Sequence, residues 1–251
     1  MISSQEKTLF SQEKLNQIKK LDIPKHVAII MDGNRRWAKK HFIPTFLGHW
    51  KGAENITTIV KAAKEIGVQT ITVFAFSTEN WARPEQEIRD LMNIFKRFLK
   101  DKREMLFVNG IKFDVIGDLT RLSKDVQEAV LLTKEHTKNC QEMELVVALN
   151  YSGRDDLRRA ISSMLKDYEQ GKLSLGDLTD EAISSYLDTK KRRDPDLLVR
   201  TSGEKRISNF LLWQISYTEI YITDVLWPDF NHEELFKAII DYQHRERRLG
   251  G

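Results

Sequence analysis

Short apolar runs, rich in β-branched residues, alternate along the chain with longer segments of helical periodicity, and this alternation limits the possible folds. Six runs have the length and composition of strands: Val27–Met31, Thr70–Phe76, Ile111–Ile116, Glu144–Leu149, Leu197–Val199 and Ile220–Ile222. Most are separated by amphipathic segments, at His49–Ile66, Glu85–Phe107, Ser123–Thr137, Asp155–Glu169 and Asp180–Leu187. Strands joined by helices form parallel sheets with both faces covered. We therefore predict an α/β fold with a mostly parallel central sheet of about six strands flanked by helices.

The length of the chain favours one domain. A chain of 251 residues with 41% hydrophobic content suits one large core, so we expect a single domain over residues 1–251. Residues 1–20 predict an N-terminal helical extension, because four large apolar residues lie at helical spacing: Leu9, Phe10, Leu15 and Ile18. We expect this helix to pack on the body of the protein, with membrane contact as the alternative. Residues 170–179 are expected to form a surface loop.

Charge and cysteine content argue against several classes of protein. The formal net charge is only +3, so no nucleic-acid partner is expected. The single cysteine, Cys140, cannot form an intramolecular disulfide, and the first 20 residues are too polar for a signal peptide, so a cytoplasmic location is expected. No run approaches the roughly 18 uncharged apolar residues of a spanning helix, so membrane contact would be peripheral.

Polar residues follow the first predicted strand in the stretch "DGNRRW". Ligands of open α/β sheets bind beyond the carboxyl ends of the strands, where this stretch would lie. Asp32 is a hard oxygen ligand for a metal, Gly33 allows close backbone approach, and Asn34 and Arg36 can donate hydrogen bonds to an anion. An Asp-Gly turn before a solvated basic helix is the alternative. Arginines in a first helical turn favour the anion, because the helix dipole there disfavours cations.

The stretch "STENWARP" follows the second predicted strand. Ser77 and Asn80 supply small polar groups, Trp81 a flat apolar wall, and Arg83 a guanidinium that matches phosphate geometry. The alternative is structural, with Thr78 as the cap of the helix that follows Pro84.

Two further stretches follow the last predicted strands. In "DLLVRTSGEKRISNFLLW", Arg200, Arg206 and Ser208 surround a tight polar loop that suits a phosphate or diphosphate, with exposed pairing to Glu204 as the alternative. In "TEIYITDVLWPDF", one acidic residue could complete a divalent metal site with Asp32, and spacing does not choose among Glu219, Asp224 and Asp229.

Several common catalytic motifs are missing from the sequence. It has no Walker phosphate loop, G-x-G-x-x-G, G-x-S-x-G or H-E-x-x-H motif, and its histidines lack zinc spacing. His49 could reach the same anion as Arg36. The other histidines are expected on the surface or at caps: His26, His41, His136, His232 and His244. Certain apolar residues could wall a cavity or fill the core: Trp37, Phe76, Trp81, Leu91, Ile94, Phe95 and Phe98.

Five stretches together resemble the successive signature regions of cis-prenyltransferases, most closely the bacterial undecaprenyl diphosphate synthases. They are "HVAIIMDGNRRWAKK", "GHWKGAENI", "TVFAFSTENWARP", "DLLVRTSGEKRISNFLLWQ" and "YTEIYITDVLWPDF", and the resemblance runs from about His26 to the C-terminus. It implies a homodimer with a hydrophobic tunnel, and Mg²⁺-dependent addition of isopentenyl diphosphate, with new cis double bonds, to an allylic diphosphate such as farnesyl diphosphate. The implied product is a long-chain polyprenyl diphosphate, such as undecaprenyl diphosphate, the precursor of the lipid carrier for cell-wall glycans. Its release implies transient contact with the inner face of the membrane.

The resemblance also implies roles for individual residues. Asp32 and Asn80 would be catalytic, and Asp32 and Glu219 would bind Mg²⁺, with Glu219 acting in the same chain or across the dimer. The implied substrate-binding residues are Gly33, Asn34, Arg35, Arg36, Trp37, His49, Ser77, Thr78, Glu79, Trp81, Arg83, Arg200, Arg206, Ile207 and Ser208. Asp229 matches a supporting acidic position.

The chain departs from the family pattern at two positions. Arg35 stands where the bacterial pattern has Gly, as in the dolichol-forming branch, and Thr45 stands where the family commonly has Arg. Losing that cation should weaken binding of the allylic diphosphate, and we hypothesise that Arg35 compensates.

Three rival classes remain to be weighed. They are a phosphate- or nucleotide-binding protein, an inactive partner subunit, and a trans-prenyltransferase. The presence of Asp32, Asn80 and Arg200 disfavours the inactive subunit. Asp155-Asp156 is not followed by the spacing of a D-D-x-x-D motif, which disfavours the trans class. The sequence does not define the product length or the preferred primer.

Overall fold

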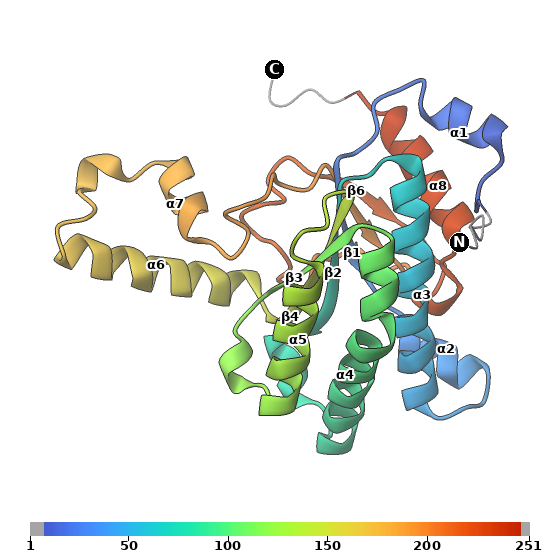
Figure 1. The fold of residues 1–251 in the computed structure, drawn as a ribbon, viewed down its shortest axis with the longest axis horizontal. Helices are drawn as coiled ribbons and strands as arrows, with labels where there is room; N and C mark the ends of the chain where they lie inside the picture. Colours follow the sequence, from blue (N-terminus) through green and yellow to red (C-terminus); the bar gives the residue numbers. More distant parts are fainter. Residues whose placement is uncertain (1–7, 247–251) are drawn as a thin grey trace.

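A parallel β-sheet of six strands forms the centre of the computed structural model, which describes residues 8–246 (Figure 1). The strands are β1 (His26–Ile30), β2 (Thr70–Ser77), β3 (Ile111–Ile116), β4 (Met143–Tyr151), β5 (Leu197–Arg200) and β6 (Glu219–Ile222). Their order is β3-β4-β2-β1-β5-β6, and every neighbouring pair is parallel. The predicted α/β class and the six-stranded parallel sheet are confirmed.

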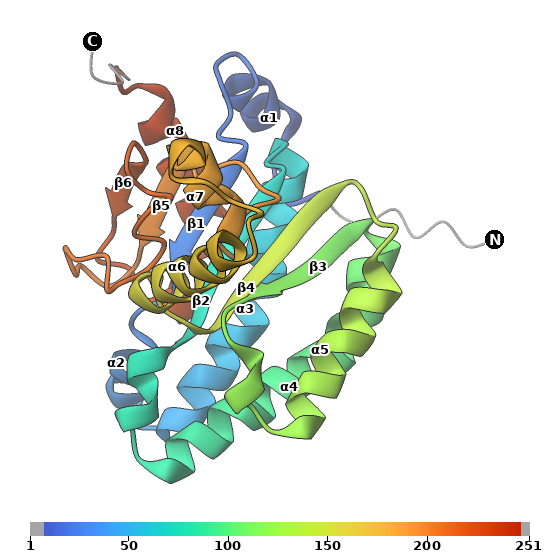
Figure 2. The same cartoon turned by 90° about the vertical axis from the view of Figure 1, so that its left-hand side faces the viewer.

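Helices cover the sheet, and four of the five helical segments predicted between the strands agree with observed helices to within two residues at each end. The helices are α1 (Gln12–Ile18), α2 (Asn34–Lys40), α3 (Thr45–Ile66), α4 (Glu85–Val108), α5 (Lys124–Thr137), α6 (Gly153–Glu169), α7 (Asp180–Tyr186) and α8 (His232–Gln243). The helices α3, α4 and α5 lie together on one side of the sheet, whereas α6 and α7 project from the other side (Figures 1 and 2). Within residues 8–246 we find no helix with the length and apolar character needed to cross a membrane.

Two helix predictions need correction. The helix α3 begins at Thr45, four residues before its predicted start, and α8 was not predicted at all. Asn231 is a residue type that favours helix N-caps and could have indicated the start of α8. In the structure its side chain accepts hydrogen bonds from the backbone amides of Glu233 and Glu234.

Alternate residues of each central strand face two different cores. In β1, Val27 and Ile29 face the larger core, which α3, α4, α5 and α8 close, whereas Ala28 and Ile30 face a smaller one. Phe210, from the segment between β5 and β6, closes the smaller core by stacking on the partly buried ring of Phe74. Irregular chain therefore covers much of one face of the sheet.

The N-terminal helix α1 packs on the body of the protein, as predicted. Phe10, Leu15 and Ile18 are buried in the larger core, and the Phe10 ring lies 5.7 Å from that of Phe236 on α8. Residues 1–7 of the predicted extension lie outside the described residues.

The prediction that His26 lies on the surface or at a cap is wrong. His26 opens a central strand and is only 1% exposed, because β2 and β5 flank it. Its ring nitrogens lie 2.8 Å from the Arg193 carbonyl oxygen and 2.7 Å from the Thr72 hydroxyl. Burial lowers the pKa of His26 to about 4, so this imidazole is neutral at pH 7.

Candidate active site

The turn after β1 brings Asp32 to the carboxyl edge of the sheet. Gly33 is the N-cap of α2 and has φ +110°, a conformation that residues with a side chain rarely adopt. A Cβ there would also lie 2.9 Å from a methyl carbon of Leu226, so there is no space for a side chain. The Asp32 amide donates to the Thr201 hydroxyl at 2.9 Å, and that hydroxyl donates to the Asp32 carbonyl at 2.7 Å. The backbone of Asp32 is therefore held independently of its side chain.

A buried arginine pairs with the Asp32 carboxylate. Arg200 ends β5, its side chain is 4% exposed, and its Nη2 donates to Asp32 Oδ2 at 2.9 Å. Its Nη1 donates to the Ser208 hydroxyl at 2.7 Å and to the Arg206 carbonyl. Among the described residues its buried Nε has no hydrogen-bond partner. Arg200 thus keeps a donor available for an anion.

A second group of charges surrounds Glu87 at the start of α4. Glu87 Oε1 lies 3.2 Å from Arg83 Nη1, 3.2 Å from His49 Nε2 and 3.9 Å from Arg35 Nε. Burial lowers the pKa of His49, although its hydrogen bond with Glu87 opposes this shift. The sequence analysis missed Glu87, although its position four residues after Arg83 on a helix indicated a pair. The structure thus brings His49, Arg83 and Arg35 together around one carboxylate.

Asn80 is fixed at the same edge by a reciprocal cap. The Ser77 side chain accepts a hydrogen bond from the Asn80 amide, and Asn80 Oδ1 accepts one from the Ser77 amide at 3.2 Å. This cap opens a short 3-10 helix at Thr78–Ala82. Thr78 does not cap α4, which begins after Pro84 without a side-chain cap, so that alternative is wrong.

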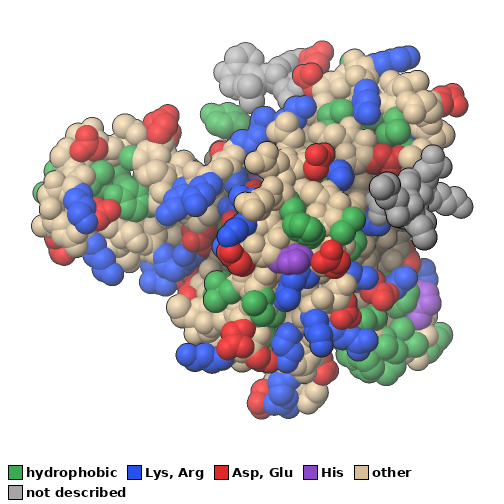
Figure 3. Space-filling view, viewed as in Figure 1, with side chains coloured by type: hydrophobic (Ala, Val, Ile, Leu, Met, Phe, Trp, Pro, Cys, Tyr) green, Lys and Arg blue, Asp and Glu red, His purple; other side chains and the backbone are tan. Residues whose placement is uncertain are grey.

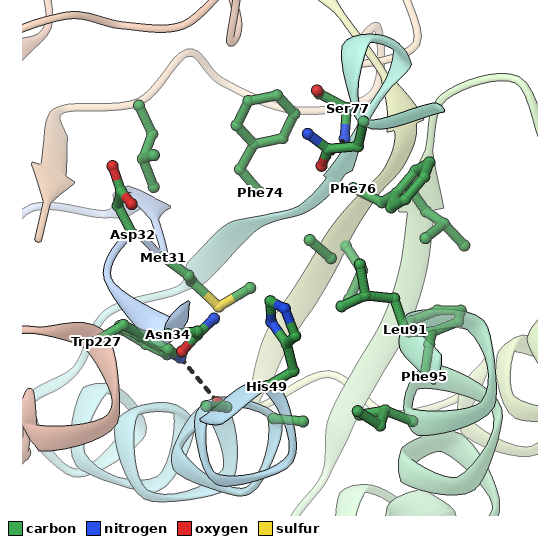
Figure 4. A pocket seen from close by; sticks show the side chains of 18 of the residues that line it. Met31, Asp32, Asn34, His49, Phe74, Phe76, Ser77, Leu91, Phe95 and Trp227 are labelled. Carbon is green, nitrogen blue, oxygen red and sulfur yellow. Dashed lines mark hydrogen bonds between the residues drawn. The ribbon is translucent and has the colours of Figure 1, made fainter. Parts of the chain in front are cut away.

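One cavity of about 640 Å³ connects the two charged groups with an apolar wall (Figure 4). Its polar lining includes Asp32, Asn34, His49, Ser77, Glu79, Asn80, Arg83, Arg200, Arg206 and Ser208. Its apolar lining includes Ala53, Ile56, Ala75, Phe76, Leu91, Met92, Ile94, Phe95, Phe98, Val147 and Leu149. Figure 4 shows Asp32 and Leu91 on opposite sides with His49 between them. Most residues proposed to wall a cavity do so, but Trp37 and Trp81 are not among those that line it.

Two further predicted arginines, Arg36 and Arg206, lie close to acidic side chains. Arg36 is half-exposed and lies 3.8 Å from Asp32 and 3.5 Å from Glu204. Arg206 pairs with Glu204 at 2.5 Å, which is the exposed ion pair weighed as the alternative to phosphate binding. Arg206 also lines the cavity.

Hydrogen bonds and packing hold four other predicted residues. The Trp37 indole donates to Asp229 at 2.7 Å, and the Trp81 indole to Asn150 at 2.8 Å. The Thr78 hydroxyl donates to the Glu79 carboxylate at 3.3 Å, outside the cavity lining. Ile207 packs against the smaller core.

One predicted metal ligand lies far from Asp32 within the chain. Glu219 begins β6 in register with Leu197, which is in register with Val27 of β1, so it lies toward the amino edge of the sheet. Its carboxylate pairs with Arg245 at 2.9 Å. The strand register therefore separates Asp32 and Glu219 of the same chain too far for both to bind one metal ion.

The carboxyl edge of the sheet fits Mg²⁺ through the Asp32 carboxylate together with oxygens from a substrate. Within residues 8–246 no group of three or more His, Cys, Asp or Glu side chains could hold a metal ion. Protein sites for Mg²⁺ often use one or two carboxylates together with substrate phosphates and water. Asp32, with a side chain 30% exposed beside the cavity, fits that pattern when a diphosphate supplies further oxygens.

A charged edge beside a cavity with an apolar wall fits a molecule with an anionic head group joined to an apolar tail. Residues 30–250 match the family model described as "Putative undecaprenyl diphosphate synthase". The isoprenyl transferase of Clostridium perfringens is 48% identical over 91% of this chain and 90% of its own length. That of Chlamydia trachomatis is 46% identical over 98% of each chain.

Two solved structures share the fold. Lavandulyl diphosphate synthase from Lavandula x intermedia, in complex with dimethylallyl diphosphate, has a TM-score of 0.89 and 35% identity, covering 91% of this chain and 99% of its own. A probable undecaprenyl diphosphate synthase from Campylobacter jejuni has a TM-score of 0.77 and 34% identity, covering 92% and 100%. The chain belongs to the undecaprenyl diphosphate synthase family and is an isoprenyl transferase of the cis-prenyltransferase class.

Proposed function

We propose that this enzyme adds isopentenyl diphosphate units, one after another and in cis configuration, to farnesyl diphosphate. The proposed product is a long-chain polyprenyl diphosphate, undecaprenyl diphosphate, which serves as the precursor of the lipid carrier for cell-wall glycans. The carrying observation is that a single cavity runs from the Asp32–Arg200 pair to an apolar wall that includes Leu91 and Phe98. A diphosphate can bind at the charged end while a growing hydrocarbon chain fills the apolar end.

Two diphosphate sites account for the arginines around the cavity. We assign the allylic diphosphate to the start of α2 and to His49, because Asn34 and His49 line the cavity beside Asp32. We assign isopentenyl diphosphate to Arg200, Arg206 and Ser208, which follow β5. The buried, unpartnered Nε of Arg200 supports this assignment, since a phosphate oxygen would satisfy it.

The reaction forms a carbon–carbon bond between the two substrates and releases diphosphate and a proton. Asp32 would hold Mg²⁺, which when bound neutralises charge on the departing diphosphate. The arginines would hold both diphosphates in line for bond formation. We place Asn80 near the proton that isopentenyl diphosphate loses, because the reciprocal cap with Ser77 fixes this side chain at the cavity.

We propose a homodimer in which the partner subunit supplies Glu219 to the metal. Glu219 and Asp32 of one chain are too far apart along the sheet to share an ion, so a shared site requires two chains. The projecting helix α6 exposes Ile161, Leu165 and Tyr168, which supports a protein interface there (Figure 1). We also propose a cytoplasmic enzyme that contacts the inner face of the membrane transiently, because a long polyprenyl product must pass into lipid.

The test is the product formed from radiolabelled isopentenyl diphosphate with farnesyl diphosphate and Mg²⁺. We expect an organic-soluble product that, after dephosphorylation, migrates with undecaprenol on thin-layer chromatography. Parallel reactions with geranyl and dimethylallyl diphosphate define the primer. If no labelled apolar product forms with any primer, the chain is a phosphate-binding protein without prenyl transfer, and the proposal is wrong.

A further inference from the structure

Large apolar side chains are exposed in the turn between α2 and α3 and in the first turn of α3. Phe42 is 97% exposed, Phe46 47% and Leu47 37%. Figure 3 shows hydrophobic side chains gathered at the position that α2 and the following turn occupy in Figure 1, with basic side chains beside them. We call this surface the α2–α3 corner and define it as Lys39, Lys40, Phe42, Ile43, Phe46 and Leu47. An exposed apolar cluster rimmed by polar groups marks an interaction site.

The backbone at Phe42 shows that folding alone does not explain this residue. Phe42 has φ +55°, its amide donates to the Lys39 carbonyl at 3.2 Å, and the Ile43 amide donates to the Ala38 carbonyl at 3.1 Å. This is a helix C-terminal turn whose left-handed position usually carries Gly. A bulky aromatic residue there adopts an unfavourable conformation and leaves its ring in water. Phe42 therefore carries two costs that a glycine would avoid, which indicates a function outside the fold.

The charged residues in the segment that forms the corner are all basic. Residues 33–53 contain Arg35, Arg36, Lys39, Lys40 and Lys51, but no Asp or Glu. Within the described residues, the ammonium groups of Lys39, Lys40 and Lys51 make no ion pair, and all three side chains are exposed. Unpaired lysines beside exposed aromatic and aliphatic side chains are the combination that anionic lipid surfaces attract.

The corner is continuous with the walls of the cavity. Asn34 on α2 and His49 on α3 line the cavity, and the exposed residues belong to the same two helices and the turn between them. Two close contacts join these helices, because a Cβ at Gly48 or Gly52 would lie 2.4 Å from an oxygen of Asn34. A membrane that binds the corner would therefore lie next to the elements that enclose the apolar chain.

We propose that the α2–α3 corner is a docking surface for an anionic phospholipid bilayer. The ring of Phe42 inserts among the acyl chains, with Phe46 and Leu47 beside it, while Lys39 and Lys40 contact phosphate groups. This inference deepens the membrane contact proposed above and in that respect rests on the proposed function. Binding itself, however, requires neither substrate nor catalysis, so the two can be tested separately.

The test is co-sedimentation of the full chain with vesicles of phosphatidylcholine, with and without phosphatidylglycerol. We expect binding only when phosphatidylglycerol is present, and weaker binding as salt is raised. Phe42→Gly should lower the partition coefficient about tenfold, since a buried aromatic ring is lost. The double variant Lys39→Gln/Lys40→Gln should lower it about tenfold or more, because each lysine near an anionic surface contributes separately.

Matched control variants distinguish binding through the α2–α3 corner from non-specific binding through other exposed apolar or basic side chains. Leu131→Gln removes an apolar side chain that is 63% exposed on α5, and Lys19→Gln/Lys20→Gln removes an exposed lysine pair beside α1. Figures 1 and 2 place α1 at the opposite end of the molecule from α2. Both controls should bind vesicles like the unchanged chain. Phe42→Gly should melt at the same temperature or higher, because glycine suits the left-handed turn, so lost binding would not reflect unfolding.

Three results would overturn the docking proposal. In the first, Phe42→Gly binds vesicles as well as the unchanged chain does. In the second, the unchanged chain binds vesicles equally well with and without phosphatidylglycerol. In the third, the α2–α3 corner is buried between two copies of the chain. Sedimentation velocity without vesicles detects the last, as a larger species that Phe42→Gly converts to a smaller one. Prenyl transfer is measured on the same samples in detergent. A chain that makes polyprenyl product but ignores vesicles refutes docking alone, whereas vesicle binding without product refutes the proposed function alone.

Discussion

Replacing Asp32 with Ala should affect stability and turnover by different amounts, because its carboxylate has a structural partner as well as a chemical task. The variant leaves the Arg200 guanidinium, 4% exposed, without its carboxylate. Breaking a fully buried ion pair costs about 3–5 kcal/mol. Asp32 is 30% exposed, however, so water screens the pair, and we expect a loss of about 1–3 kcal/mol in the free energy of unfolding.

The effect of the same variant on turnover should be larger. A metal ligand that stabilises a departing diphosphate is worth several kcal/mol, and about 4 kcal/mol corresponds to roughly a thousandfold in rate. Asp32→Asn is the matched control for structure, because its amide oxygen can still accept from Arg200 while its charge is gone. We expect Asp32→Asn to keep most of the stability and to lose nearly as much turnover as Asp32→Ala.

Two measurements decide this prediction. Urea unfolding gives the free energy for each variant, and initial incorporation of radiolabelled isopentenyl diphosphate at saturating Mg²⁺ gives turnover. Turnover within tenfold of the unchanged enzyme in both variants would refute the role of Asp32 in the chemistry. Equal loss of stability in both variants would refute the claim that its pairing with Arg200 depends on the acceptor oxygen.

Three further predictions concern the primer, the product and pH. Arg35→Gly should raise the KM for the allylic substrate several-fold, because it removes a cation beside Glu87, and an unchanged KM would show that Arg35 does not compensate for Thr45. Ala75→Leu should shorten the product seen by thin-layer chromatography, since Ala75 lines the cavity, and an unaltered product distribution would place the growing chain elsewhere. Because the pKa of His26 is about 4 in the folded protein and about 6.5 in the unfolded chain, the unfolded chain binds a proton first as pH falls. The free energy of unfolding should therefore decrease between pH 6.5 and pH 4, by up to about 3 kcal/mol. His26→Gln should therefore weaken the dependence of urea unfolding on pH between 6.5 and 4, and an identical dependence would contradict this.

The parts of the fold that follow from local pattern were predictable. Apolar runs such as Val27–Met31 predicted strands, and the parallel arrangement predicted that Asp32 and Arg200 would meet at one edge. That inference needs only the rule that parallel strands end on the same side of the sheet. The apolar side chains of α4 line the cavity, which was one of the two alternatives that the sequence left open, because helical periodicity places Leu91 and Phe98 on one face.

The parts that depend on tertiary contacts were not predictable. The sequence around His26 does not reveal that its strand is central, so its burial was missed. The placement of Glu219 depends on strand register, which spacing cannot define, and the Glu87 cluster requires α3 and α4 to be adjacent. The turn at Phe42 was also missed, because the residue there is not the Gly that usually marks such a turn.

A crystal structure with Mg²⁺ and a non-hydrolysable thiol analogue of farnesyl diphosphate tests the central claim most directly. The account predicts the diphosphate against the start of α2 beside Asp32, the metal on the Asp32 carboxylate, and the farnesyl tail in the cavity against Leu91 and Phe98. A diphosphate bound away from Asp32, or a tail outside this cavity, would contradict it.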